Sequence, residues 1–293
     1  MTITSTMPTV LRDVPFVDYL RIDAMNFTRL KHYGVSALHG HTAEQTGIES
    51  DSLRRGRAVH TLTLEPEKFN QEYFVFELDG NTRTKAFREQ KQSILEANAD
   101  KTVLSMEEYK DAQLMASAIA RHPLASKLLA RCKRRELTIT WQHGEVVCKA
   151  RIDAFGKGPY GLVNEHSLSA SAEVVYQIDI KTTRSIEPNL FSRAVADYRY
   201  DAQSAWYEDG VRAVDPARFT IVHLFIAVEN KPPFDVVVYE LNQDQVEVGR
   251  RYNYRCLEVY LEALRSGVYR GISESVRPLF LPSYLQRIEG VMS

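Results

Sequence analysis

The sequence predicts a mixed α/β fold, in which a central β-sheet is flanked by helices, with a helical N-terminal part. Helical spacing of apolar residues dominates residues 1–131, whereas the apolar/polar alternation that is typical of strands appears from residue 132 onward. The second observation is that the sequence contains no internal repeat or low-complexity block. We therefore expect a single domain over 1–293, with 1–131 as its mostly helical portion and 132–293 as its core sheet and helices.

The N-terminal portion contains three helical patterns. Residues 1–50 show a loose helical spacing around residues 17–33. Residues 50–66 begin with good N-cap residues, end at a proline, and repeat their less polar positions at intervals of three and four. Residues 105–131 predict one or two further helices, with a break near Pro123.

Strand patterns follow these helices. Residues 136–142 and 145–155 flank His143-Gly144, which predicts a hairpin with a two-residue turn. A glycine- and serine-rich stretch, residues 156–172, precedes a third strand at 174–183, and its composition fits either a loop at a site or a simple connection. The remaining predicted elements are a helix from about 188 to 211, strands at 218–229 and 234–241, and an amphipathic helix over 242–267.

The predicted turn decides which residues of the hairpin face one another. One side is apolar, with the facing pairs Trp141 and Val146, Ile139 and Cys148, and Leu137 and Ala150. The other side is polar: Glu136 lies opposite Arg151 and diagonal to Asp153. The hairpin is therefore expected to cover a core with one face and to present charges on the other.

The third strand adds two charges to this polar surface. Asp179 and Lys181 lie two residues apart, so strand alternation points them to one face, while Ile178 and Ile180 point to the other. If the three strands are neighbours, Glu136 and Asp153 join them, although a slip of one residue would scatter the set.

Such a set of charges has a specific chemical meaning. Converging carboxylates repel one another unless a cation lies between them, and their oxygens suit Mg²⁺ or Mn²⁺. A lysine beside that ion can orient water and stabilise charge on phosphorus. The pattern favours metal-assisted phosphodiester hydrolysis, and a solvated ladder of surface charges is the alternative interpretation.

Composition limits the class of protein. Apolar residues make up 44% and charged residues 26%, as in globular proteins, and no run approaches the roughly 20 apolar residues of a membrane span. The N-terminus lacks the pattern of a secretion signal, and Cys132, Cys148 and Cys256 fit reduced thiols better than disulfides or a metal motif. We therefore expect a cytoplasmic location. The net charge of −1 excludes a broadly basic nucleic-acid coat, so any phosphate contact must come from a local patch.

Three further residues complete the pattern. His60 lies in the helix over 50–66, and Gln203 and Tyr207, four residues apart, share one face of the helix over 188–211. Taken alone, His60 fits a packed or surface histidine, and the Gln/Tyr pair fits an ordinary helix face.

In order, the segments GRAVH, CKARIDAF, IDIKTT and QSAWY resemble the motif series of the PD-(D/E)XK nuclease superfamily. They most resemble its RecE-like branch, which includes the nuclease domain of exodeoxyribonuclease VIII and its phage or prophage relatives. The resemblance extends over about residues 26 to 265 and implies a restriction-endonuclease-like core. One departure is Ile152, which stands where the motif's name has a proline.

The resemblance implies a role for each matching residue. The implied ligands of Mg²⁺, for which Mn²⁺ would substitute, are His60, Asp153, Asp179 and the backbone carbonyl of Ile180. Lys181 would position or activate the attacking water, and Glu136 would be a further acid of the catalytic set. Gln203 and Tyr207 would contact DNA and support the site.

Basic residues near these motifs are candidates for DNA contacts, although a solvated helix face is the alternative for most. They are Arg54, Arg55, Arg57, Arg83, Lys85, Arg184, Arg193 and Arg199. Binding through such residues would weaken as the salt concentration rises.

Three functions follow from the sequence and the resemblance. The leading one is a metal-dependent exodeoxyribonuclease that degrades linear double-stranded DNA from its ends, 5′ to 3′, to prepare single strands for annealing recombination. The resemblance implies a single-strand annealing protein as partner, a homo-oligomeric ring, and the host cytoplasm as its place if a phage encodes it. The alternatives are an endonuclease or single-strand-specific nuclease of the same fold, and a non-catalytic DNA-binding module.

Overall fold

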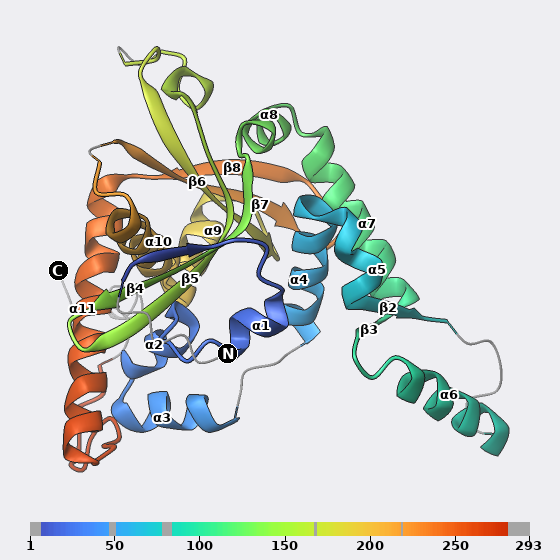
Figure 1. Cartoon of the computed structure of the whole chain (residues 1–293), viewed down its shortest axis with the longest axis horizontal. Coiled ribbons are helices and arrows are strands. Elements are labelled where there is room, and N and C mark those ends of the chain that lie inside the picture. The colour runs from blue at the N-terminus through green and yellow to red at the C-terminus, as the bar shows by residue number, and fades with distance from the viewer. Residues whose placement is uncertain (1–6, 47–50, 78–83, 167–168, 218, 281–293) are drawn as a thin grey trace, which may run out of the picture.

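The central element of the protein is a six-stranded mixed sheet. The computed structural model describes residues 7–46, 51–77, 84–166, 169–217 and 219–280, and in these ranges the sheet has the order β1-β4-β5-β6-β7-β8 (Figure 1). Its strands are β1 (Thr9–Leu11), β4 (Arg134–His143), β5 (Val146–Pro159), β6 (Glu173–Thr183), β7 (Ile221–Glu229) and β8 (Val236–Leu241). Within this sheet β6 and β7 are parallel and the other neighbours are antiparallel. The predicted mixed α/β fold is confirmed.

Helices account for most of the chain before β4. They are α1 (Phe16–Arg21), α2 (Phe27–Tyr33), α3 (Ala37–Thr46), α4 (Asp51–Leu64), α5 (Phe69–Glu72), α6 (Lys85–Ala97), α7 (Met106–Arg121) and α8 (Pro123–Arg131). The start of α7 is fixed by a capping box between Ser105 and Glu108, and Pro123 separates α7 from α8 as predicted. No helix in the described ranges has the length and apolar character needed to cross a membrane.

Three short strands were not predicted from the sequence. These are β1 and the parallel pair β2 (Tyr73–Phe76) and β3 (Thr102–Ser105), each of three or four residues, which is too short for a readable alternation. The helix between β2 and β3, α6, stands away from the main body (Figure 1).

Both faces of the sheet are covered by helices, and the two largest apolar cores of the described residues lie there. In the α4/α7 core, α4, α7 and α8 pack on β6 and β7, and Ile178 and Ile180 are buried there. In the α10/α11 core, α2, α10 (Tyr200–Val214) and α11 (Gln243–Ser266) pack on the β4–β5 hairpin, with Trp141 and Trp206 in contact. Each large aliphatic side chain that is fully buried in this way stabilises the fold by roughly 1.5–3 kcal/mol.

The hairpin register differs from the prediction by two residues. Trp141 pairs with Cys148, not with Val146, because the turn consists of Gly144 and Glu145. Gly144 has a φ of 56°, which a residue without a side chain adopts most readily, and this selects it as the first turn residue. A shift of two residues leaves the side chains on their predicted faces, so the apolar face of the hairpin is as expected.

The prediction of a single helix over 188–211 was wrong, because the structure has two helices there. Arg199 has a left-handed conformation with a φ of 58°, and it separates α9 (Pro188–Tyr198) from α10. The two helices form the crossover that parallel strands require between β6 and β7. This break decides where α10 begins, and α10 carries Gln203 and Tyr207 to the site.

Candidate active site

The structure brings together the residues that the sequence assigned to a catalytic cluster. Asp153 lies on β5, Asp179 and Lys181 on β6, Glu136 on β4 and His60 on α4. Ligand atoms of His60, Glu136 and Asp153 all lie within 4.8 Å of one another. Five residues from four elements therefore meet at one place, although they are separated by up to 121 positions in the chain.

Asp153 lies at a bend in β5. Its neighbours Ile152 and Ala154 would share a face of a straight strand, yet Ile152 packs in the α10/α11 core and Ala154 in the α4/α7 core. Beyond the bend, β5 pairs with β6, starting at Ala154 and Ile178. The Asp153 carboxylate accepts a hydrogen bond of 2.7 Å from the backbone N–H of Ile180, which fixes it between the two strands.

Glu136 has an unusual backbone conformation, with a φ of 45°. It lies between two paired positions of the β4–β5 ladder and is itself unpaired there. For a residue with a side chain, this conformation costs on the order of 1–2 kcal/mol. Its carboxylate accepts a hydrogen bond of 2.6 Å from Nε of Arg151, the contact expected from the sequence, although Arg151 itself pairs with Thr138. Burial, and then the charge of Asp153, raise the pKa of Glu136 to about 7.

His60 connects α4 to both β5 and β6. Its Nε2 lies 2.9 Å from the carbonyl oxygen of Ile180, and its Nδ1 lies 3.3 Å from Oδ2 of Asp153. Burial alone would lower the pKa of His60, but the charge of Asp153 and the hydrogen bond to it raise the pKa to about 9. Both ring nitrogens therefore donate, as in an imidazolium.

Lys181 lies between an acid and an amide. Its Nζ is 2.7 Å from Oδ2 of Asp179 and donates to Oε1 of Gln203 at 2.8 Å. Gln203 in turn donates to the Tyr207 hydroxyl at 2.7 Å, and the ring of Tyr200 lies 4.1 Å from Nζ. Burial would lower the pKa of Lys181, but the charge and hydrogen bond of Asp179, together with Tyr200 and Asp153, outweigh burial and raise the pKa, so the amine is held as an ammonium.

Asp179 on β6 is a further acid whose protonation the site alters. Burial raises the pKa of Asp179 to about 6, although the charge of Lys181 opposes the rise. The pKa of Asp153, by contrast, is lowered: burial would raise it, but the charge and hydrogen bond of His60, the charge of Lys181 and the Ile180 N–H together outweigh burial. The two acids thus differ in proton affinity because their neighbours outweigh burial at Asp153 but not at Asp179.

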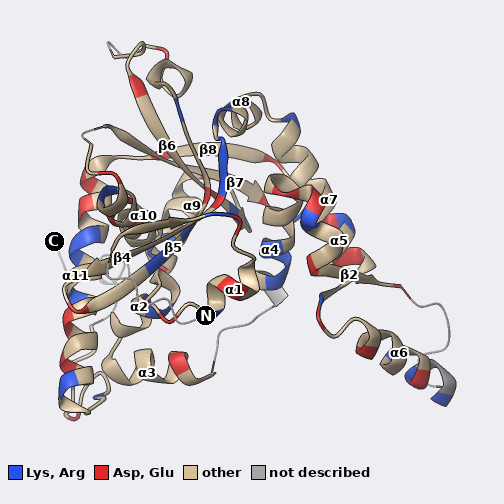
Figure 2. Cartoon of the chain, in the orientation of Figure 1, with Lys and Arg blue, Asp and Glu red and all other residues tan. Residues whose placement is uncertain are grey.

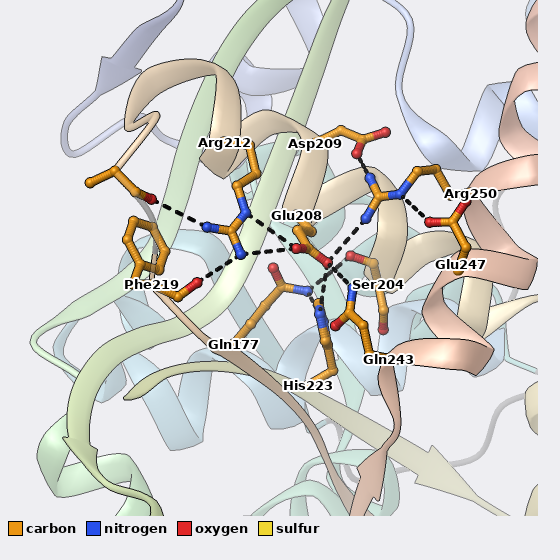
Figure 3. Close-up of polar contacts among 11 residues, drawn as sticks. Gln177, Ser204, Glu208, Asp209, Arg212, Phe219, His223, Gln243, Glu247 and Arg250 are labelled. Atoms are coloured by element: carbon orange, nitrogen blue, oxygen red, sulfur yellow. Dashed lines mark hydrogen bonds and ion pairs between the residues drawn. The ribbon is translucent and has the colours of Figure 1, made fainter. Parts of the chain in front are cut away.

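A buried polar network fixes α10 against the sheet (Figure 3). Glu208 accepts hydrogen bonds from Nε2 of His223 on β7 at 3.1 Å and from Arg250 on α11 at 3.1 Å. The amide of Gln177 on β6 donates to the Ser204 carbonyl at 3.1 Å and lies 2.9 Å from Nδ1 of His223. Glu208 directly follows Tyr207, and Gln177 precedes Asp179 by two residues, so the network sets the position of Gln203 relative to Lys181.

Sequence reasoning missed Tyr200 and this network. Tyr200 lies beside Lys181 because Arg199 ends α9, His223 is a single polar residue in an apolar strand, and Glu208 is a buried acid next to Asp209. Polar residues at positions where the strand and helix patterns predict buried apolar side chains could have indicated this network.

The predicted DNA contacts do not all lie near the cluster. Arg55 and Arg57 lie on α4 within five residues of His60, and the Arg57 guanidinium lies over the Phe16 ring at 5.4 Å. Arg184 is exposed three residues after Lys181. Lys85 is exposed on the projecting helix α6, away from the cluster, and forms an ion pair of 3.5 Å with Glu89 (Figure 1). Arg83 lies outside the described residues.

The other three arginines have different surroundings. Arg54 forms an ion pair of 2.6 Å with Glu108, and Arg199 forms one of 2.9 Å with Asp201 while lying over the Tyr252 ring. Arg193 is exposed on α9. Two of the three are therefore occupied within the fold.

The residues present fit a divalent cation. Two carboxylates and an imidazole converge, and the raised pKa of Glu136 shows that negative charge is disfavoured there without compensation. The carboxylate oxygens suit a hard divalent cation, and the imidazole nitrogen is a common ligand of transition-metal ions. The grouping differs from the set implied by the resemblance: Glu136 belongs to it, whereas Asp179 is paired with Lys181 and the Ile180 carbonyl contacts His60.

Comparisons with known proteins agree with this fold. A crystal structure of a protein from Eubacterium rectale, whose exonuclease assignment is provisional, superposes with a TM-score of 0.55 at 11% identity. The match covers 97% of this chain and 99% of that one. A second structure, protein VC1899 from Vibrio cholerae, has a TM-score of 0.22 at 11% identity over 81% of this chain and 56% of that one, which is too low to carry an argument. No curated protein matches the sequence.

The family comparison covers most of the chain. Residues 26–275 match the family described as a PDDEXK-like domain of unknown function, DUF3799. The match includes every residue of the cluster and both supporting residues of α10. The chain therefore belongs to this PDDEXK-like family.

Proposed function

We propose that the protein is a divalent-metal-dependent exodeoxyribonuclease that hydrolyses the phosphodiester bonds of linear double-stranded DNA. The observation that carries the proposal is the convergence of His60, Glu136 and Asp153 beside the Asp179–Lys181 pair. Membership of a PDDEXK-like family supports a nuclease, and the fold shared with the Eubacterium rectale protein is compatible with an exonuclease.

His60, Glu136 and Asp153 would hold the cation, with Asp179 on the adjacent strand. The cation, Mg²⁺ or Mn²⁺, supplies a Lewis acid that offsets charge on the phosphate and makes bound water more acidic. His60 must give up a proton to act as a ligand, because only a neutral imidazole nitrogen has a free lone pair.

Lys181 serves as a donor in this proposal. Its raised pKa keeps it protonated at neutral pH, so it is unsuited to take a proton from water. An ammonium held between Asp179 and Gln203 can instead hold the attacking water in line with phosphorus and offset charge on the phosphoryl oxygens. Gln203 and Tyr207 keep its amine in that position.

The finer features of the proposal are supported by the order of the motifs in the sequence. They are end-dependent degradation with 5′-to-3′ polarity, release of single strands for recombination by an annealing protein, and assembly into a homo-oligomeric ring. Each of these features can be tested independently of metal-dependent cleavage by the cluster.

The test is degradation of end-labelled linear duplex DNA beside covalently closed circular DNA, with Mg²⁺ or with EDTA. Loss of the linear DNA alone, only with Mg²⁺, supports the exonuclease, and the label released first gives the polarity. Cutting of the circle would indicate an endonuclease, and preference for single strands would indicate the other alternative. Salt-sensitive binding without cleavage would leave a DNA-binding module.

A further inference from the structure

The segment that leads into β4 is strongly basic. Residues 112–135 contain no Asp or Glu but include Arg121, Lys127, Arg131, Lys133, Arg134 and Arg135, in a protein whose net charge is −1. The segment ends directly before Glu136, a member of the catalytic cluster. Figure 2 shows the basic residues along α8 and the start of β4.

Four of these residues form what we call the basic strip: Lys127, Arg131, Lys133 and Arg134. All four are exposed, and none forms an ion pair or a side-chain hydrogen bond with any residue in the described ranges. Arg135 behaves differently, because its guanidinium donates to the Leu129 carbonyl and holds the end of α8. Unpaired like charges repel one another, so the strip carries an electrostatic cost that an anionic partner would relieve.

The backbone under the strip is fixed. Leu128 and Cys132 are buried in the α4/α7 core, and the Cys132 N–H donates to the Leu128 and Leu129 carbonyls at 3.3 and 3.1 Å. The chain crosses β5 so closely that a Cβ added at Gly156 would lie 2.5 Å from the carbonyl oxygen of Arg131. Gly156 is three residues beyond Asp153, so the strip is held beside the cluster on a rigid support.

The spacing of the strip suits a phosphate backbone. At about 3.3 Å per residue, Arg134 at the start of β4 lies roughly 7 Å from Glu136, and Lys133 directly precedes it. Successive phosphates of one DNA strand advance by about 3.4 Å along the helix axis, so these residues lie within a few phosphates of the cluster.

We infer that the basic strip binds the phosphate backbone of the DNA duplex next to the scissile bond. This inference rests on the proposed nuclease function and adds a binding surface to it. The strip contacts phosphates and not base edges, so it contributes affinity and register without sequence preference.

The test compares two triple variants with the same change in charge. Arg131→Gln, Lys133→Gln and Arg134→Gln alter the strip, and the control alters three exposed arginines of α11 and the segment after it, Arg251→Gln, Arg255→Gln and Arg270→Gln. Figure 1 shows α11 along the left edge of the molecule and α8 apart from it at the top. Binding to a linear duplex is measured over a range of salt concentrations with Ca²⁺, which takes oxygen ligands as Mg²⁺ does.

Each phosphate contact contributes about −0.9 to the slope of log K against log salt concentration, so loss of three contacts reduces the slope by about 2.7. The control should keep the wild-type slope, and Arg134→Gln alone should reduce it by about 0.9. If wild type cuts DNA but the strip variant keeps the wild-type slope, the inference about the basic strip is wrong, and the proposed nuclease function is unaffected. If wild type neither binds nor cuts DNA, the proposed function fails and the strip fails with it.

Discussion

Nε2 of His60 lies 2.9 Å from the carbonyl oxygen of Ile180, which joins a helix to the central catalytic strand. The same imidazole reaches Asp153 through Nδ1 at 3.3 Å. His60 therefore links Asp153 on β5 to the backbone of β6, between Asp179 and Lys181.

His60→Gln should weaken the binding of Mn²⁺ or Mg²⁺ by roughly tenfold or more, because even indirect partners of metal ligands contribute this much. Calorimetric titration of the metal gives the dissociation constant. The control is His166→Gln, an exposed histidine beside Glu165. Equal metal affinity in wild type and His60→Gln would exclude His60 as a ligand.

Gln203→Ala should lower the single-turnover cleavage rate by roughly 10- to 100-fold, because Lys181 loses the acceptor that orients its ammonium. Both polar ends of the Gln203 amide are already bonded, to Lys181 and Tyr207, so affinity for DNA should hardly change. Rates at saturating enzyme, with binding measured separately, check this. Gln113→Ala on the exposed face of α7 is the control. A loss confined to affinity would instead make Gln203 a DNA contact.

Glu208 should make stability depend on pH. Burial would raise its pKa, but the hydrogen bond and charge of His223 lower it to about 2 from an ordinary value of 4.5. A carboxylate with a lowered pKa stabilises the folded state above about pH 4.5, and this contribution is lost as the pH falls toward 2.

Glu208→Gln should therefore cost about 3 kcal/mol of unfolding free energy at pH 7, and the difference from wild type should shrink below about pH 4.5. Urea unfolding between pH 7 and pH 3 measures it, with the exposed Glu262→Gln as control. A difference that stays constant over this range would show that the network acts through packing alone.

Two glycines offer a matched pair of substitutions. A Cβ at Gly156 would lie 2.5 Å from backbone atoms of Arg131 and Cys132, which cannot move aside, so Gly156→Ala should destabilise the fold by about 1–3 kcal/mol. A Cβ at Gly56 in α4 would lie 3.5 Å from the Thr182 hydroxyl, an ordinary contact, so Gly56→Ala should stabilise by about 0.5–1 kcal/mol. Thermal unfolding of both variants measures the two signs, and a neutral Gly156→Ala would contradict the close crossing.

Much of the sheet could be predicted because alternation is a local property. The apolar faces of the hairpin and of β6 followed from every second residue, so Asp179 and Lys181 were correctly placed on one side of their strand. The hairpin register could not be predicted from the same pattern, since Gly144 begins a two-residue turn as readily as it ends one.

The geometry of the cluster depends on features that a single sequence does not reveal. The polar surface forms because β5 bends at Asp153 and because Glu136 adopts a positive φ, and neither is encoded by residue type. His60 lies 93 positions before Asp153, so only the motif order suggested that they meet. The partnership of Glu208 with His223 is likewise set by tertiary packing.

The central claim is that this cluster hydrolyses DNA with Lys181 as its essential cation. The most direct test is the Mg²⁺-dependent, single-turnover cleavage of a linear duplex by wild type and by Lys181→Ala, with Lys231→Ala, an exposed lysine between β7 and β8, as control. The account predicts that Lys181→Ala cleaves DNA about 10²- to 10⁴-fold more slowly than wild type, as expected when a key electrostatic group is removed. The variant should still bind DNA. Cleavage by Lys181→Ala at the wild-type rate would contradict it.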